Sequence, residues 1–168
     1  MNKKRKLIKI ILNGAGLALY LVAFISFFLT WVYAYIAGAG VAGAYKGYEL
    51  ALNFDGIPQN LGTLFPLLFV LGALIYALIA LIKKLANLKK EPKEQTSSPF
   101  KVLLLGAFFI ICAGIITLFL SLSSLNMLNL SSKKYGGYYL GIGAYLTAYT
   151  SLVGGLIMFI TESGLIKD

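Results

Sequence analysis

The sequence contains no histidine, one cysteine, four prolines and only six acidic residues among 168. Without histidine, the usual zinc, haem and imidazole-based sites lose their commonest ligand. The single cysteine, Cys112, has no partner for a disulfide within the chain. We therefore expect no metal site and no cofactor. Charged residues make up 12% of the chain and hydrophobic residues 59%, whereas an average soluble domain has about 25% charged residues. These values exclude an ordinary soluble domain and indicate an integral membrane protein.

Four apolar segments without any charged residue are long enough to cross a bilayer, which takes about 20 helical residues. The first follows a basic tail, Met1–Lys6, but it is much longer than the apolar part of a secretory signal. We therefore expect it to stay as a helix. The chain is predicted to be a single all-α domain, 1–168, folded as an antiparallel bundle of four transmembrane helices. The expected spans are 10–36, 61–82, 102–122 and 137–160.

The basic residues are distributed unevenly between the two sides of this bundle. Twelve of the 15 Lys and Arg residues lie in the N-terminal tail, in loop 83–101 or at the C-terminus. The positive-inside rule then places both termini and loop 83–101 in the cytoplasm, and loops 37–60 and 123–136 outside. We expect a multi-pass protein of the plasma membrane. The net charge of +9 sets this orientation and does not indicate nucleic-acid binding.

Loop 83–101 begins with a cluster of lysines beside the membrane. Such lysines gain about 1 kcal/mol each near an anionic leaflet. Lipid contact is the favoured interpretation, and recognition by a cytoplasmic partner is the alternative. The residues expected to contact anionic lipid are Lys83, Lys84, Lys89 and Lys90.

Small residues recur along one side of the last span at alternating spacings of four and three. Such a column lets helix backbones approach closely in a membrane, where lipid tails give apolar side chains no reason to associate. Packing within the chain is the favoured role, with homodimerisation or partner docking as the alternative. Beside this small-residue seam, Tyr138, Tyr145 and Tyr149 are expected to meet other helices, lipid headgroups or water, with a ligand cleft less favoured. The seam comprises Gly137, Gly141, Ala144, Ala148, Ser151 and Gly155.

The first outer loop alternates apolar with polar or small residues from Tyr48 to Asp55. A period of two predicts a half-buried strand and allows one hairpin in this loop; a short helical turn is the alternative. The glycines at 38, 40, 43 and 47 resemble a phosphate loop, but no Lys-Ser/Thr follows them, so a compact turn is favoured. The residues expected to make contacts on this side are Trp31, Tyr48, Glu49 and Asp55.

None of the four apolar segments contains Asp, Glu, Lys, Arg or His. Ion-coupled transport usually needs such groups inside the membrane, and a serine nucleophile would have no base. We therefore expect no enzyme activity and no catalytic residues. A channel or transporter subunit would need an oligomer in which interior polar groups face a shared path. Candidates for that path are Asn13, Thr117, Ser121, Thr147 and Thr150.

The layout resembles that of small, mostly uncharacterised four-span membrane proteins of low-GC bacteria. The residues that support this are Trp31, Gly47–Tyr48–Glu49–Leu50–Ala51 and the segment 140–146, Leu-Gly-Ile-Gly-Ala-Tyr-Leu. The architecture is also similar to claudin-like tetraspans, which implies a small outer sheet on a four-helix bundle. The claudin pattern has a cysteine pair after the tryptophan, and this chain lacks it.

Together these observations predict a non-enzymatic accessory or scaffold protein of the membrane. Its contacts with protein or lipid would run through the outer loops and the last span. The alternative is an oligomeric channel or transporter subunit for a small solute. Expected partners are membrane lipid and a membrane protein or a second copy of the chain.

Overall fold

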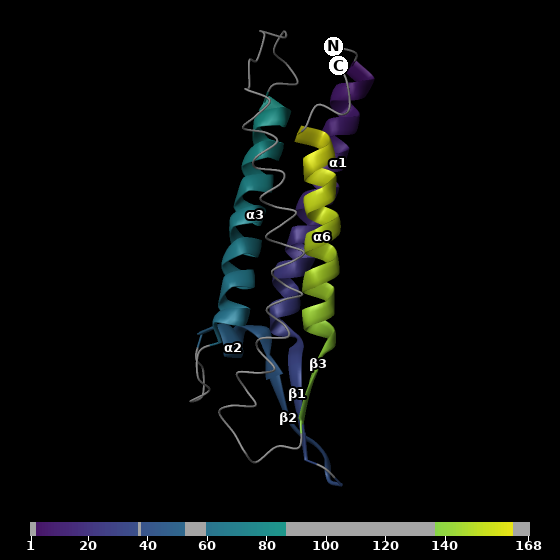
Figure 1. The fold of residues 1–168 in the computed structure, drawn as a ribbon. Coiled ribbons are helices and arrows are strands. Elements are labelled where there is room, and N and C mark those ends of the chain that lie inside the picture. Colours follow the sequence, from purple (N-terminus) through teal and green to yellow (C-terminus); the bar gives the residue numbers. More distant parts are fainter. Residues whose placement is uncertain (1–2, 37, 53–59, 87–136, 163–168) are drawn as a thin grey trace.

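The computed structural model of the chain describes residues 3–36, 38–52, 60–86 and 137–162. Three long helices, α1 (Lys3–Ile25), α3 (Leu61–Ala86) and α6 (Ile142–Glu162), run along the same axis, and α1 packs against both others (Figure 1). A small sheet lies at one end, called the sheet end below. The opposite end, where α1 begins and where α3 and α6 finish, is called the lysine end.

Within the described residues, three helical segments are long and apolar enough to cross a membrane. They are Lys6–Phe28, Leu61–Ala86 and Ile142–Thr161. The chain is therefore a membrane protein that is mainly helical and has a small sheet. The remaining expected span, 102–122, lies outside the described residues.

The first helix is shorter than the sequence predicted. It ends at Ile25, is followed by a 3-10 turn, η1 (Ser26–Phe28), and then turns into strand β1 (Thr30–Ile36) through the extended residue Leu29. The expected span of 10–36 is therefore wrong at its C-terminal end. β1 is built from β-branched and aromatic residues, which favour strands. Because residues 10–36 contain no charged residue, the apolar run alone did not separate the strand from the helix before it.

The sheet joins two segments that are distant in the sequence. β1 pairs antiparallel with β2 (Gly40–Lys46) on one side and with β3 (Gly137–Leu140) on the other, giving the order β2-β1-β3. Gly38 and Gly40, both with a φ of about 83°, make the turn between β1 and β2, a conformation that other residues rarely adopt. A hairpin is thus present, but its strands are residues 30–36 and 40–46, so it begins inside the expected first span and does not use the segment from which it was predicted.

The strand predicted from Tyr48 onward is instead a short helix, α2 (Gly47–Leu52). The carboxylate of Glu49 accepts a hydrogen bond from the backbone N–H of Lys46 at 2.8 Å. This is the reach-back half of a capping box, which stabilises a helix start. The period-two prediction was therefore wrong, and the helical alternative is correct for residues 47–52, while 53–59 lie outside the described residues.

Helix α3 begins beside α2 with an asparagine cap. The side-chain Oδ1 of Asn60 accepts the backbone N–H of Gly62 at 2.8 Å, as an N-cap residue does. The Asn60 backbone N–H donates to the carbonyl of Leu50 at 2.9 Å. These two bonds fix where α3 starts relative to α2.

The last span also begins later than predicted. Residues 137–140 form β3, Gly141 follows it, and α6 begins at Ile142. Gly141 donates its backbone N–H to the carbonyl of Trp31 at 2.7 Å, which extends the contact between β3 and β1 up to the helix. The chain thus changes from strand to helix within one residue.

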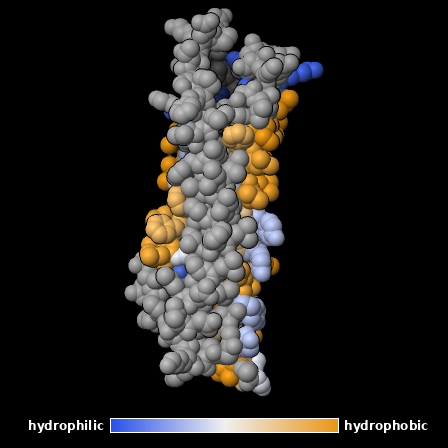
Figure 2. Space-filling view, viewed as in Figure 1, coloured by the Kyte–Doolittle hydropathy of each residue, from blue (hydrophilic) through white to orange (hydrophobic). Residues whose placement is uncertain are grey.

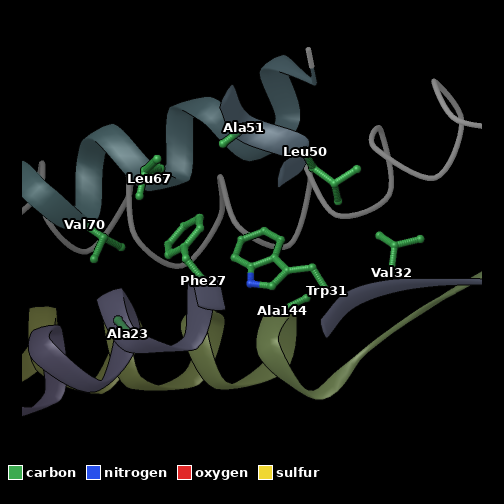
Figure 3. Close-up of a cluster of buried hydrophobic side chains, with 9 residues drawn as sticks. All are labelled: Ala23, Phe27, Trp31, Val32, Leu50, Ala51, Leu67, Val70 and Ala144. Atoms are coloured by element: carbon green, nitrogen blue, oxygen red, sulfur yellow. The ribbon is translucent and has the colours of Figure 1, made fainter. Parts of the chain in front are cut away.

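The core lies where the helices meet the sheet. A cluster of buried side chains there draws on α1, η1, β1, α2, α3 and α6. A second, smaller cluster lies between the helices further along and includes Tyr20, Ala73, Ala77 and Met158. Figure 3 shows the first cluster, which consists of Ala23, Phe27, Trp31, Val32, Leu50, Ala51, Leu67, Val70 and Ala144.

Candidate contact site at the junction of helices and sheet

Trp31 is the centre of the junction between helices and sheet, and only 1% of its surface is exposed. Its indole N–H donates to the backbone carbonyl of Ser26 at 3.1 Å, and its ring centroid lies 4.5 Å from that of Phe27. In Figure 3 the indole lies between the α3 side and the α6 side of the core. An outer contact role needs an exposed ring, so the structure makes Trp31 a packing residue.

A β-bulge explains why Trp31 points into the core. The register of β1 against β2 passes from Thr30–Lys46 to Val32–Tyr45, which leaves Trp31 as the extra residue on β1. A bulge changes the direction in which a strand residue points. Tyr33 and Tyr35, further along the same strand, are partly or largely exposed.

Two glycines allow the indole to fit. A Cβ atom on Gly47 would lie 2.6 Å from the indole Nε1, and one on Gly143 would lie 2.6 Å from its Cδ1 and 2.7 Å from the Ser26 carbonyl oxygen. Real Cβ atoms do not approach that closely. No packing role was expected for either glycine: Gly47 was expected to mark a turn, and Gly143 was named only as part of the segment 140–146. The short Gly-Ile-Gly sequence at the start of α6 was the available signal for Gly143.

A pair of hydroxyl groups ties α6 to the end of α1. The side chains of Ser26 and Thr147 are hydrogen-bonded to each other and are fully buried. Each hydroxyl has one hydrogen, so one of them donates to the other, which is then free to donate to a nearby backbone carbonyl. Ser26 Oγ lies 2.6 Å from the carbonyl oxygen of Ala23, and Thr147 Oγ1 lies 2.9 Å from that of Gly143. In an apolar core, such a bond fixes the position of the two helices relative to each other.

The small-residue seam lies mostly on the inner side of α6. Ala144, Ser151 and Gly155 are buried, and Ala148 is half-buried. A Cβ on Gly141 would overlap the backbone of Thr30. These positions fit the favoured prediction of packing within the chain. Gly137, in contrast, lies in β3 opposite Tyr35 and is not part of the helix.

Helices α1 and α6 also approach each other closely at two glycines, Gly16 and Gly154, that the seam did not include. A Cβ on Gly16 would lie 3.0 Å from the side chain of Met158, and one on Gly154 would lie 3.3 Å from Cβ of Leu19. The carbonyl of each glycine also lies within 3.6 Å of the Cβ position of the other. The surface of α6 that packs on α1 therefore includes Gly154 as well as the seam residue Gly155.

The other predicted outer contacts have structural neighbours of their own. Tyr48 is half-buried, with its ring 5.4 Å from that of Phe28 and the Lys46 ammonium group 5.7 Å from the ring centroid. Glu49 caps α2. Asp55 lies outside the described residues. Of the predicted outer contacts that the structure describes, Tyr48 and Glu49 therefore stay partly accessible, and Trp31 does not.

The predicted lipid-contacting lysines are described only in part. Lys83 is exposed and Lys84 half-exposed in the last turn of α3, at the lysine end. Their positive charges also interact favourably with the negative, C-terminal end of the α3 helix dipole. Lys89 and Lys90 lie outside the described residues.

The polar groups expected to line a path mostly bond back to their own helix. Asn13 Nδ2 donates to the Lys9 carbonyl at 2.9 Å, and Thr150 Oγ1 donates to the Leu146 carbonyl at 2.6 Å. Thr117 and Ser121 lie outside the described residues. The described segments contain no group of three His, Cys, Asp or Glu residues that could hold a metal ion.

Three tyrosines of β1 and β3 form an aromatic face on the sheet, in which Tyr33 is half-buried and Tyr35 and Tyr139 are exposed. Tyr33 and Tyr139 are directly opposite on β1 and β3, with ring centroids 5.0 Å apart and planes 20° apart. Tyr35 lies beside Tyr139 at 6.5 Å. Tyr35 and Tyr139 are 37% and 44% exposed. The alternation Tyr33-x-Tyr35 was the signal in the sequence that places both rings on one face.

Compared with models of protein families, with curated proteins and with solved structures, the chain matches none.

Proposed function

We propose that the chain is a non-enzymatic accessory or scaffold protein of the membrane that contacts a partner protein through its sheet. The observation that supports this most is the exposed face of Tyr33, Tyr35 and Tyr139 on a sheet that is locked to the helices. Aromatic side chains supply large contact areas at interfaces. Because the sheet is held rigidly by its packing on the helices, less conformational entropy is lost when a partner binds to it.

The edge of the sheet adds a second contact element. In the described part of the chain, β2 pairs only with β1, so its other edge has no neighbouring strand there. Val41 on this edge strand is exposed. Exposed edges of this kind bind extended segments of other proteins by adding a strand.

The proposed location is the plasma membrane, with both termini in the cytoplasm and the sheet outside. The concentration of lysines at the end opposite the sheet supports this orientation through the positive-inside rule. The lysines at the end of α3 would then contact anionic lipid of the inner leaflet. A small sheet mounted on one end of the helices is also what the resemblance to claudin-like tetraspans implies.

Purification of the full chain in native nanodiscs tests this function. We expect a stoichiometric partner with the natural sequence and loss of that partner in Tyr35→Ala with Tyr139→Ala. Leu68→Ala, on the exposed side of α3, is the matched control and should keep the partner. A chain that brings down the same proteins with and without the two tyrosines would contradict the proposal.

The alternative, an oligomeric channel or transporter subunit, has one observation in its favour. Asn13 Oδ1, Thr63 Oγ1 and Ser151 Oγ are buried without a hydrogen-bond partner, and such atoms often bind water. Solute flux into proteoliposomes that is lost in Asn13→Leu would support this alternative. Flux equal to that of empty liposomes would leave the scaffold proposal as the better one.

A further inference from the structure

Strand β2 forms an exposed edge of the sheet, and most of its residues are exposed. Residues 30–45 contain no charged residue and no proline, whereas such residues protect many natural edges from pairing with other strands. Figure 2 shows the hairpin at the lower end of the molecule in pale blue, white and orange, without the deep blue of charged residues. The bulge at Ala42 divides the strand, so residues 43–46 keep a regular register and Ala44 lies within them.

The backbone N–H and C=O of Ala44 point away from β1. Backbone groups of successive strand residues point alternately to the two sides of a strand. The N–H of Gly47 donates to the Leu29 carbonyl at 3.4 Å, toward the β1 side, whereas the N–H of Lys46 donates to the Glu49 carboxylate at 2.8 Å. Lys46 therefore faces away from β1. Ala44, two residues before it, presents its N–H and C=O at the open edge.

The side chains next to Ala44 differ sharply in size. Directly opposite residues of an antiparallel pair share one face of the sheet, so Ala44, Tyr33 and Tyr139 form one row across the three strands. The Tyr33 ring stacks on Tyr139, on the β3 side. On the β2 side, its opposite residue has only a methyl group. A strand added at this edge lies about 10 Å from β1, so a large side chain on it can lie over Ala44 and reach the Tyr33 ring.

Other occupants match this edge less well. Lipid tails offer no partner for the exposed N–H and C=O groups. A second copy paired through the centre of its own β2 would set Ala44 against Ala44, so the space beside Tyr33 would stay unfilled. A strongly charged segment gains little, because Lys46, at the end of the strand, is the only charged residue of β2.

We propose that an extended, uncharged segment of a partner protein adds as a strand beside Ala44, with a large apolar or aromatic side chain directly opposite this residue. The backbone of the segment bonds to the N–H and C=O of Ala44, and its side chain packs on Tyr33. In strand addition, the backbone bonds give affinity and the spaces for alternate side chains give specificity. This inference rests on the proposed function, because it states how the partner of the sheet binds.

Amide hydrogen exchange tests the strand addition. It is measured by NMR on the full chain in native nanodiscs, with and without the co-purified partner. We expect exchange at Ala44 to slow by about tenfold or more in the complex. Exchange at Tyr45, whose N–H points toward β1, should be slow in both samples. A partner that binds while exchange at Ala44 is unchanged would overturn the inference and leave the proposed function standing. A natural sequence that retains no partner would contradict both.

Ala44→Phe tests the requirement for a large side chain on the partner. The new ring would fill the space beside Tyr33, and phenylalanine is favoured in strands, so the fold should persist. We expect about tenfold less partner in the complex, because the partner's side chain would now clash. Ala39→Phe, at an exposed alanine of the same hairpin, is the matched control and should keep the partner. Full retention by Ala44→Phe, or a partner whose mass identifies it as a second copy, would overturn the proposal.

Discussion

Trp31 has a glycine on either side of its indole, and this arrangement makes the junction sensitive to a single methyl group. In Gly143→Ala the new Cβ would lie 2.6 Å from the indole and 2.7 Å from the Ser26 carbonyl oxygen. Because one of these neighbours is backbone, we expect a loss of about 1–3 kcal/mol in the free energy of unfolding, as for overpacked cores. Thermal unfolding in detergent, followed by fluorescence, measures this loss. Trp31 is the only tryptophan, so its emission reports on this site.

Gly72→Ala is the matched control for that substitution. No atom lies within 4 Å of the Cβ position at Gly72, and alanine in a helix interior is favoured over glycine by about 1 kcal/mol. We expect equal or higher stability. If Gly72→Ala destabilised the protein as much as Gly143→Ala, the close contact at the indole would not be the cause.

The Ser26–Thr147 bond gives a second prediction at the scale of single residues. Thr147→Val keeps the side-chain shape but removes the bond between η1 and α6. We expect a loss of about 0.6 to 1.7 kcal/mol, the range of side-chain hydrogen bonds between membrane helices. Thr150→Val, whose hydroxyl bonds only within its own helix, should change stability less. Equal losses in the two variants, measured by unfolding in mixed micelles, would argue against a special role of the bond.

At the scale of helices and strands, the start of α3 depends on one side chain. Asn60→Ala removes the acceptor for the Gly62 N–H, so we expect a loss of about 1 kcal/mol. Asn60→Ser keeps a capping oxygen and should retain most of the stability. Hydrogen exchange at Gly62 and Thr63 measures this directly. Faster exchange should appear in the alanine variant, and equal exchange in both variants would show that the cap contributes little.

The sequence predicted the long apolar helices better than the sheet, for a physical reason. Length and hydropathy identify a segment that crosses the membrane, and the helices at 61–86 and 142–161 agree with that prediction. Residues 30–36 contain no charged residue and continue the apolar run of the first helix, but they are a strand because β2 and a segment more than 90 residues away pair with them. Neither hydropathy nor local period carries information about such distant partners.

The candidate site was predicted only in part, again because local patterns in the sequence do not reveal contacts between distant segments. Spacing along the last span identified its inner side through Ala144, Ser151 and Gly155. Trp31 was expected to make contacts on the outer side, close to the end of the expected first span. Its burial depends on a bulge in β1 and on Gly47 and Gly143, which come from different segments. Close contacts of this kind follow from the three-dimensional arrangement and not from composition.

Among the described residues, the lysines other than Lys46 lie at one end of the molecule and the tyrosine-bearing sheet lies at the other, so the orientation decides what each end can contact. We expect the sheet to face outward because basic residues favour the cytoplasmic side. In the chain with Cys112→Ser, Ala42→Cys places a thiol on exposed β2, and Lys83→Cys places one at the lysine end.

In intact cells, a membrane-impermeant maleimide should label Ala42→Cys and should label Lys83→Cys only after permeabilisation. Ala42 is suited to this test because it is the extra residue of the bulge between the Gly43 and Val41 pairs, so its substitution breaks no matched pair. The reverse labelling pattern would place the sheet in the cytoplasm. The partner proposed for the sheet would then have to be a cytoplasmic protein, and the lysines could not be contacting the inner leaflet.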